Sequence, residues 1–293
     1  MANRTVYNID SLTLRLPYNQ MVDHFASMTL DQIELHYDYE LKVLDKSDHK
    51  VWVNATYENQ QKEIGIIQFD NKAKTALLFI DHTLFYEQLT TSLINNSYLK
   101  VNMLGCLEYF LDSMGFDLER VYIENIVLCR DELSNSNTTI NLIKKYHRHP
   151  EYETIIFDKV HPKDNILVDT FTFVDTLIHG VQKHIEIKDC CYIGNPTGSI
   201  RFLSYNKSKQ IHITNENYIP DYNEFPSEKP FYRTEITLTG NQLQKYLEDN
   251  ELTNNGWFFV SDLYPTHLEK LFRFYSNKII HFRQIDNGNV VNI

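Results

Sequence analysis

Glycine, proline and cysteine are all scarce in this chain of 293 residues. It has 9 glycines and 8 prolines beside 19 tyrosines and 17 phenylalanines, and an aromatic-rich chain with few breakers favours β-sheet over a loop-rich scaffold. None of its 4 cysteines lies in a C-x-x-C spacing. This argues against a cysteine zinc motif and against the disulfide framework of a small secreted protein.

Targeting signals and positive charge are also lacking. The sequence shows no N-terminal secretion signal and no stretch of about 18 uninterrupted apolar residues, so we expect a cytoplasmic protein that does not enter a membrane. The 28 Lys and Arg residues are outnumbered by 39 Asp and Glu, which gives a net charge of −11. This deficit argues against broad, nonspecific binding to nucleic acid, because such affinity comes from Lys and Arg that neutralise phosphates.

One segment departs from this acidic average. Residues 190–215 carry three basic side chains and no Asp or Glu, enough for a small basic surface on an acidic protein. Within it, GSIRFLSYNK predicts a strand over residues 199–207. Side chains alternate along a strand, so Arg201, Tyr205 and Lys207 would share one face, opposite an apolar one. The simplest interpretation is a half-buried strand whose charged side meets water.

Most of the chain reads as short strands, with helices concentrated towards the C-terminus. Apolar or β-branched runs separated by polar turns predict an antiparallel meander in the first part, and a later strand is predicted to lead into a polar RDELSNSN loop. Strands are expected at YNIDSLTLRLP, VWVNATY, EIGIIQF, TALLFI, RVYIENIVLC, IRFLSYNK and FYRTEITL. Helices are expected from Leu104 to Met114, ending before Gly115, from 169 to 184, from Asn241 onwards and from 266 to 275. The TFTFV start of the second helix is equally compatible with a strand.

These elements predict an α+β protein with an antiparallel β-sheet core flanked by helices and a helical C-terminal part. We expect residues 1–239 to form the sheet domain and residues 240–293 a helical extension packed on it. A single domain is the alternative, because no repeat or low-complexity linker separates the two parts.

Three of the predicted strands stand in a fixed order: VYIENIVLC, IRFLSYNK, and FYRTEITL followed by a helix. With this order the chain resembles the rolling-circle replication initiators of filamentous phages and plasmids. Their signature strands run approximately R-I-D-x-x, then R-x-Y-x-K, then R-x-E-x-x-L. Here RFLSYNK carries the second pattern through Arg201, Tyr205 and Lys207, and YRTEITL carries the third through Arg233 and Glu235.

The resemblance implies a role for each of these residues. In that family a tyrosine attacks one strand of origin DNA, stays joined to the 5′-phosphate and leaves a 3′-hydroxyl for a polymerase, and this role falls on Tyr205. Lys207 would supply positive charge beside a phenol whose pKa is otherwise near 10. Glu235 would help hold a divalent cofactor, Mg²⁺ or Mn²⁺. Arg201 and Arg233 would clamp DNA phosphates.

The same residues also have purely structural interpretations. Tyr205 is one of 19 tyrosines, and a strand tyrosine more often packs than reacts. Glu235 and Arg233, two residues apart, also fit an ordinary cross-strand charge pair. The ordered set therefore carries more weight than any one of its members.

The metal site departs from the family pattern. Where the first signature strand usually has an aspartate ligand, the alignment of IENIVLC places Asn125, which offers a carbonyl oxygen but no charge. Three outcomes stay open: a weaker metal site, replacement by Glu124 or Asp131, or loss of cutting. We interpret the nearby pair His147 and His149, in YHRHP, as a surface turn rather than a metal motif.

The leading hypothesis is a metal-dependent DNA nickase that joins Tyr205 to a 5′-phosphate and starts rolling-circle replication of a phage, plasmid or integrated element. The alternative is a noncatalytic relative that recognises an origin or hairpin without cutting, and a third class is a structural or protein-interaction protein. Under the first hypothesis the partners are single-stranded or hairpin origin DNA, a host helicase and polymerase, and a second copy if the protein dimerises. No membrane partner is expected.

Overall fold

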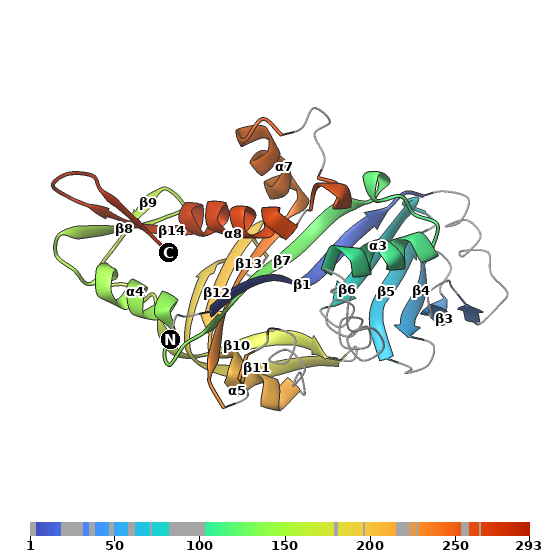
Figure 1. The fold of residues 1–293 in the computed structure, drawn as a ribbon, viewed down its shortest axis with the longest axis horizontal. Coiled ribbons are helices and arrows are strands. Elements are labelled where there is room, and N and C mark those ends of the chain that lie inside the picture. Colours follow the sequence, from blue (N-terminus) through green and yellow to red (C-terminus); the bar gives the residue numbers. More distant parts are fainter. Residues whose placement is uncertain are drawn as a thin grey trace. The chain divides into compact units, whose positions relative to one another are not determined.

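The structure is a computed structural model of the chain. It describes residues 4–18, 32–34, 39–46, 50–57, 62–70, 72–81, 103–178, 181–195, 197–214, 223, 225–226, 228–252, 258–263 and 265–293. The observed class is the predicted one, α+β with antiparallel strands flanked by helices. Figure 1 shows the elements along the chain.

The chain divides into two compact units that interleave along the sequence. The first unit comprises residues 1–8, 128–238 and 266–293, and the second comprises 9–127 and 239–265. Strands β1 (Arg4–Leu16) and β7 (Tyr122–Leu133) pass from one unit into the other. The predicted extension at 240–293 is therefore not one body, because its first part belongs to the second unit and its remainder to the first.

In the first unit the strands are hydrogen-bonded in the order β10, β11, β12, β13 and β7. The three pairings from β10 to β13 are antiparallel and continuous in register. The bounds are Asp169–Ile178 for β10, Val181–Gly194 for β11, Ile200–Tyr205 for β12 and Phe231–Thr239 for β13. The helix predicted over 169–184 is wrong: this segment forms the β10–β11 hairpin, because its Thr, Phe, Val and Ile residues favour strands.

Helices α4 (Thr138–His147) and α8 (Pro265–Ile279) cover one face of this sheet. On α4, the Thr139 hydroxyl lies 3.3 Å from the Thr234 hydroxyl of β13, and on α8 the Phe272 ring packs edge-on against Tyr7 of β1. The helix predicted over 266–275 is confirmed as α8, and its Leu268, Leu271 and Phe272 are buried. Helix α4 falls in a segment for which no helix was predicted.

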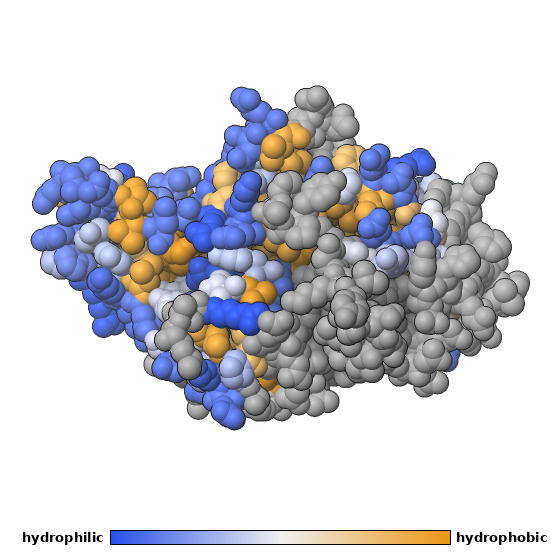
Figure 2. Space-filling model, in the orientation of Figure 1, coloured by the Kyte–Doolittle hydropathy of each residue, from blue (hydrophilic) through white to orange (hydrophobic). Residues whose placement is uncertain are grey.

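A second, four-stranded antiparallel sheet belongs to the same unit. Its order is β15, β14, β8 and β9, and β14 pairs with β8 across a long sequence separation. The bounds are Tyr152–Ile156 for β8, Lys159–His161 for β9, Ile280–Gln284 for β14 and Val290–Asn292 for β15. Asp158 and Lys159 at the β8–β9 turn and Asp286 in the β14–β15 turn are exposed, and Figure 2 shows many hydrophilic residues over this sheet.

The second unit contains the N-terminal meander. Its strands follow the order β1, β6, β5, β4, β3 and β2, all paired antiparallel. The bounds are Gln32–Glu34 for β2, Tyr39–Lys46 for β3, Lys50–Tyr57 for β4, Lys62–Asp70 for β5 and Thr75–Asp81 for β6. The strands predicted at β1, β4, β5 and β6 are confirmed. Gly65 is required on β5, because a Cβ there would lie 2.5 Å from the Phe79 carbonyl oxygen.

The described residues of the second unit also form the α-helices α3 and α7. Helix α3 (Met103–Ser113) ends where predicted: Gly115 adopts a φ of 76°, and the amide of Phe116 donates to the Leu111 carbonyl, as in a helix C-terminal cap. The helix predicted from Asn241 is confirmed as α7 (Gly240–Asp249), which buries Leu243 and Leu247. Short 3-10 turns, η2 (Leu118–Arg120) and η3 (Val260–Asp262), lie near these helices in the sequence. None of the described helices is long and apolar enough to cross a membrane.

Candidate functional site

Four of the predicted site residues, namely Arg201, Tyr205, Arg233 and Glu235, share one face of the first unit's sheet. Strand β12 pairs with β13 so that Tyr205 lies opposite Arg233 and Leu203 lies opposite Glu235. Directly opposed residues in an antiparallel pair point to the same face. The predicted alternation of β12 is therefore confirmed for Arg201, Leu203 and Tyr205, and the third motif shares their face.

The Tyr205 hydroxyl donates a hydrogen bond to Glu235 Oε1, with an oxygen to oxygen distance of 2.6 Å. This distance is typical of a hydroxyl bound to a charged carboxylate. The bond runs diagonally between neighbouring strands, from two residues 30 positions apart in the sequence. The structure thus brings together the predicted nucleophile and the predicted acid.

The Tyr205 ring is buried, with 2% of the residue exposed. It packs with Leu203 and Cys190, and Tyr192 lies against this cluster. Burial, with a smaller contribution from the Asp169 charge, raises the pKa of Cys190 to about 11, so the neighbouring sulfur stays a neutral thiol. A phosphodiester can reach the Tyr205 hydroxyl only if the surrounding side chains move.

Lys207 does not continue the strand as predicted. Strand β12 ends at Tyr205, and helix α5 (Lys207–Thr214) begins two residues later, with Lys207 2% exposed. Asn206 terminates the strand because its side chain caps the helix that follows. Its Oδ1 accepts a hydrogen bond from the amide of Lys209 at 3.2 Å, as at a helix N-cap. An asparagine in this position is a recognised helix start signal, and it was the one cue to α5 that the sequence offered.

The assignment of Arg233 to a DNA phosphate does not fit this structure. Arg233 is fully buried and forms a bidentate ion pair with Asp131, with Nε to Oδ1 at 2.6 Å and Nη2 to Oδ2 at 2.7 Å. Both side chains are 0% exposed. The RDEL segment that carries Asp131 continues strand β7 rather than forming a loop, and this places the carboxylate beside β13.

Two asparagines extend this buried pair, and sequence reasoning missed both. Asn223 Nδ2 donates to Asp131 Oδ2 at 2.9 Å, and Asn8 Nδ2 donates to Asn223 Oδ1 at 3.0 Å. Asn8 and Asn223 are buried. Neither lies in a motif, and single asparagines in polar segments give no signal. This series of hydrogen bonds from Asn8 to Arg233 holds β13 in place next to Glu235.

The remaining predicted residues lie outside the Tyr205 hydrogen bond. Arg201 is half-buried, and its charge partly offsets the burial that raises the pKa of Tyr192. Asn125 belongs to the second unit, where its Oδ1 is buried without a hydrogen-bond partner in the described part of the chain. The proposed replacements for it have other partners, since Glu124 accepts from Arg15 Nε at 3.0 Å and Asp131 pairs with Arg233.

The histidines of YHRHP are only partly the surface turn that we predicted. His147 is buried at the end of α4, and its ring nitrogens bond to the Thr154 hydroxyl and the Asn165 carbonyl, each at 2.8 Å. His149 is half-exposed. With both nitrogens engaged, His147 is a structural residue. Among the residues described, no group of three or more His, Cys, Asp or Glu could hold a metal ion.

Comparison with known proteins assigns no family to this chain. No protein-family model matches the sequence, and no curated protein matches it. Among solved structures, the chain is similar to a rolling circle replication initiator protein from Geobacillus stearothermophilus, with a TM-score of 0.47 and 12% sequence identity. The alignment covers 98% of this chain and 89% of that one.

Chemically, the Tyr205 and Glu235 pair is an acid and base arrangement around a phenol. A carboxylate that already accepts the hydroxyl hydrogen is placed to take that proton when the oxygen bonds to an electrophile. The Tyr205 ring is buried, whereas Glu235 is partly exposed. Arg233 and Asp131 neutralise each other, so they hold the strands in register without adding net charge.

Proposed function

We propose that this protein initiates rolling-circle replication by cutting one strand of origin DNA with Tyr205. The observation that carries the proposal is the 2.6 Å hydrogen bond from the Tyr205 hydroxyl to Glu235 Oε1. Two motifs that resemble the initiator signatures contribute one residue each to it. A strand tyrosine that only packs against its neighbours would have no carboxylate to accept its hydroxyl proton.

The proposed reaction transfers a phosphodiester from DNA to the enzyme. The Tyr205 oxygen attacks phosphorus, a new oxygen to phosphorus bond forms, and the bond from phosphorus to the 3′-oxygen breaks. The phenol proton passes to Glu235, and the departing 3′-oxygen takes a proton from water. The products are a 5′-phosphotyrosine and a free 3′-hydroxyl, which a host polymerase can extend while a helicase opens the duplex.

The metal requirement remains part of the proposal. A magnesium ion is commonly held by one or two carboxylates together with substrate phosphates and waters, and in this proposal Glu235 contributes one carboxylate to Mg²⁺ or Mn²⁺. A cation bound there would stabilise negative charge on the phosphate. Asn125 stays a sequence prediction as a second ligand.

Covalent labelling tests the nuclease assignment. The protein is incubated with Mn²⁺ and single-stranded origin DNA labelled at its 3′ end, because the fragment that stays attached through its 5′-phosphate carries that label. We expect a labelled protein band on a denaturing gel and a phosphotyrosine at position 205 in the digested protein. Tyr205→Phe should abolish the band, and Glu235→Gln should slow its formation about 100-fold or more, the usual contribution of a general base.

A matched control is available next to the site. Tyr192 is a half-buried tyrosine that packs against the Tyr205 cluster. Tyr192→Phe also removes a phenol hydroxyl, and it should leave labelling unchanged. Chelation of the metal with EDTA should stop labelling of the wild-type protein. If Tyr205→Phe and the wild type give equal labelling, Tyr205 is not the nucleophile and the assignment fails.

One observation favours the noncatalytic alternative, an origin-binding protein that does not cut. Tyr205 is only 2% exposed, which suits a structural hydrogen bond as well as a nucleophile awaiting its substrate. In that case origin DNA should bind with equal affinity in the presence of Mn²⁺ or EDTA, and no labelled band should form with any single-stranded substrate.

A further inference from the structure

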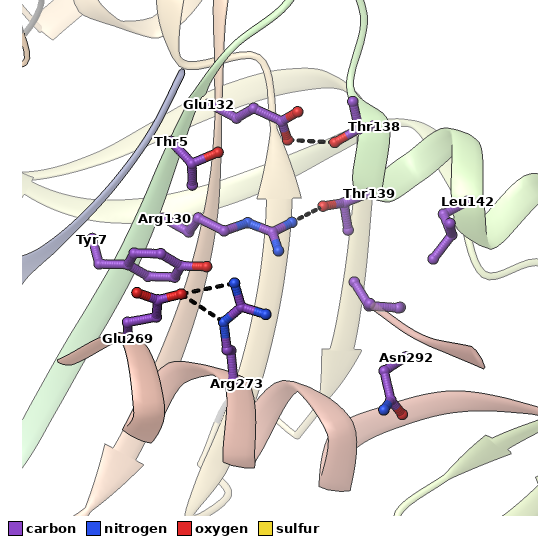
Figure 3. A pocket seen from close by; sticks show the side chains of 11 residues that line it. Thr5, Tyr7, Arg130, Glu132, Thr138, Thr139, Leu142, Glu269, Arg273 and Asn292 are labelled. Carbon is purple, nitrogen blue, oxygen red and sulfur yellow. Dashed lines mark hydrogen bonds and ion pairs between the residues drawn. The ribbon is translucent and has the colours of Figure 1, made fainter. Parts of the chain in front are cut away.

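An open pocket of about 450 Å³ lies in the first unit between β1, β7, α4 and α8. Polar side chains dominate its lining, and Figure 3 shows them around a common space. They are Thr5 and Tyr7 of β1, Arg130 and Glu132 of β7, Thr138 and Thr139 of α4, Glu269 and Arg273 of α8, and Asn292 of β15. The proposed cutting reaction uses none of them.

Arg130 forms the floor of this pocket. Its Cζ lies 5.5 Å from the centre of the Phe272 ring, and its Nη2 donates to the Thr139 hydroxyl at 2.5 Å. Its Nε is buried and has no hydrogen-bond partner among the described residues. A guanidinium presents five N–H donors in a fixed plane, so a buried donor left without an acceptor points to an acceptor that arrives with a ligand.

Arg273 supplies a second guanidinium from the rim. Figure 3 shows the ends of Arg130 and Arg273 directed into the same space from β7 and α8. Arg273 is held by Glu269, with Nη2 to Oε1 at 2.7 Å, and its side chain is 65% exposed. Two like charges that converge in this way repel each other, and an anion placed between them would relieve the repulsion.

The two carboxylates of the lining are bound by other lining residues, and Glu269 offsets part of the Arg273 charge. Glu269 binds Arg273 one helical turn away, and Glu132 accepts a hydrogen bond from the Thr138 hydroxyl. Thr138 and Thr139 are the first residues of α4, and the N-terminal end of a helix favours anions. The pocket thus offers two guanidinium groups, threonine hydroxyls and a helix N-terminus to one ligand.

This pocket opens on the sheet face opposite to Tyr205. Arg130 and Glu132 alternate along β7 with Asp131, whose carboxylate pairs with Arg233 beside Tyr205. Successive side chains of a strand point to opposite faces. The two sites therefore share a sheet but no side chain.

We propose that this pocket is a binding site for a phosphate group, held between Arg130 and Arg273. Guanidinium groups suit phosphate because their planar donors match two of its oxygens at once. The phosphate belongs either to the backbone of bound DNA or to a small phosphorylated compound, and both present the same chemistry to the two arginines.

Equilibrium dialysis of the full-length protein against radiolabelled inorganic phosphate tests the site. We expect saturable binding to one site, which Arg130→Gln and Arg273→Gln each weaken about tenfold or more, the usual effect of losing a charge-assisted hydrogen bond. Glu132→Gln should strengthen binding, because it removes a negative charge from the lining. Arg273 is largely exposed, so its variant keeps the test valid if Arg130→Gln does not fold.

Lys144→Gln is the matched control for net charge. Lys144 is an exposed residue of the same helix α4 that does not line the pocket, and its loss should leave phosphate affinity unchanged. Absence of saturable phosphate binding to the wild-type protein would overturn the proposal. An equal loss of affinity in Lys144→Gln and Arg130→Gln would also overturn it, because it would show only diffuse attraction.

A single-stranded oligonucleotide identifies the source of the phosphate. If the pocket holds the DNA backbone, the oligonucleotide displaces labelled phosphate and binds less tightly to Arg130→Gln and Arg273→Gln. If it holds a small compound, neither effect occurs and phosphate binding persists. Tyr205→Phe should retain phosphate affinity in both cases, so failure of the cutting assay and failure of this site are separate results.

Discussion

Arg233 and Asp131 show how a charged pair can serve a reactive site without touching the substrate. Their side chains are 0% exposed and make two hydrogen bonds to each other. Arg233 lies opposite Tyr205 on the neighbouring strand and two residues from Glu235. Breaking a buried pair leaves one charge without a counterion, which costs far more than a surface pair contributes. We therefore regard this pair as a structural support of the Tyr205 site.

Removing one partner of this pair should destabilise the protein strongly. Asp131→Asn should lower the free energy of unfolding by about 3–5 kcal/mol, because Arg233 then stays buried with an uncompensated charge. Replacing both residues with apolar ones, Asp131→Leu with Arg233→Met, should cost much less than the single change. Urea unfolding followed by circular dichroism measures all three proteins.

A surface pair gives the control for that experiment. Arg283 and Glu153 lie 2.6 Å apart on the four-stranded sheet, with side chains 48% and 32% exposed. Arg283→Gln should change stability by less than about 1 kcal/mol. Equal losses in Asp131→Asn and Arg283→Gln would contradict the role assigned to the buried pair.

Single-residue roles were predictable only where a motif carried them. Tyr205 and Glu235 could be assigned together, because strand alternation and the order of two motifs place them on one face. The partner of Arg233 could not be predicted, because the polar residues around Asp131 resemble a loop although the strand continues through them. An exposed arginine can bind a phosphate, whereas a buried arginine needs a carboxylate partner within the protein. Burial depends on contacts between strands far apart in the sequence, which local sequence patterns do not contain.

At the scale of elements, α4 depends on one residue at its start. Asn137 Oδ1 accepts the amide of Ile140 at 2.9 Å, and its Nδ2 donates to the Ser204 hydroxyl of β12 at 3.0 Å. The same side chain therefore caps the helix and ties it to the strand that carries Tyr205. Asn137 is 8% exposed, so water cannot easily replace either bond.

Substitution of this cap should separate its two functions. Asn137→Ala removes both bonds and should lower the free energy of unfolding by about 1–3 kcal/mol. Asn137→Asp keeps the acceptor for Ile140 and loses only the donor to Ser204, so its cost should be smaller. Asn141 is an exposed residue of the same helix, so Asn141→Ala should leave the free energy of unfolding unchanged. An unaltered urea midpoint in Asn137→Ala would refute this account of the helix.

Elements were predictable where their hydrophobic period was unambiguous. Strands β4, β5 and β6 and helices α3, α7 and α8 have regular apolar patterns, and all were placed near their observed bounds. The segment 169–184 was not, because its apolar residues fit both a helical stripe and a strand alternation. Its hairpin is decided by pairing with β12 through β11, which is a tertiary effect.

At the scale of the whole molecule, the two units are not consecutive pieces of sequence. The first unit takes its residues from both ends and the middle of the chain. Its limits after residues 8, 127, 238 and 265 fall within β1, β7, β13 and α8, so no composition change marks them, although the third lies next to the boundary predicted at residue 239. The boundary predicted at residue 239 followed the apparent concentration of helices after it, and that signal says nothing about which unit each helix joins.

Truncation after residue 239 should therefore unfold the first unit rather than leave a stable domain. The removed segment includes, among other buried residues of that unit, five large side chains that are at most 1% exposed, namely Phe272, Tyr275, Ile279, Ile280 and Phe282. At about 1.5–3 kcal/mol for each buried side chain, their loss amounts to about 7–15 kcal/mol, as much as the entire stability of a typical domain. We expect the 1–239 fragment to lack a cooperative urea transition, whereas a 1–284 fragment, which loses only the edge strand β15 and its turn, should keep one. A cooperative transition in 1–239 at the midpoint of the full chain would show that the C-terminal segment is a separate extension after all.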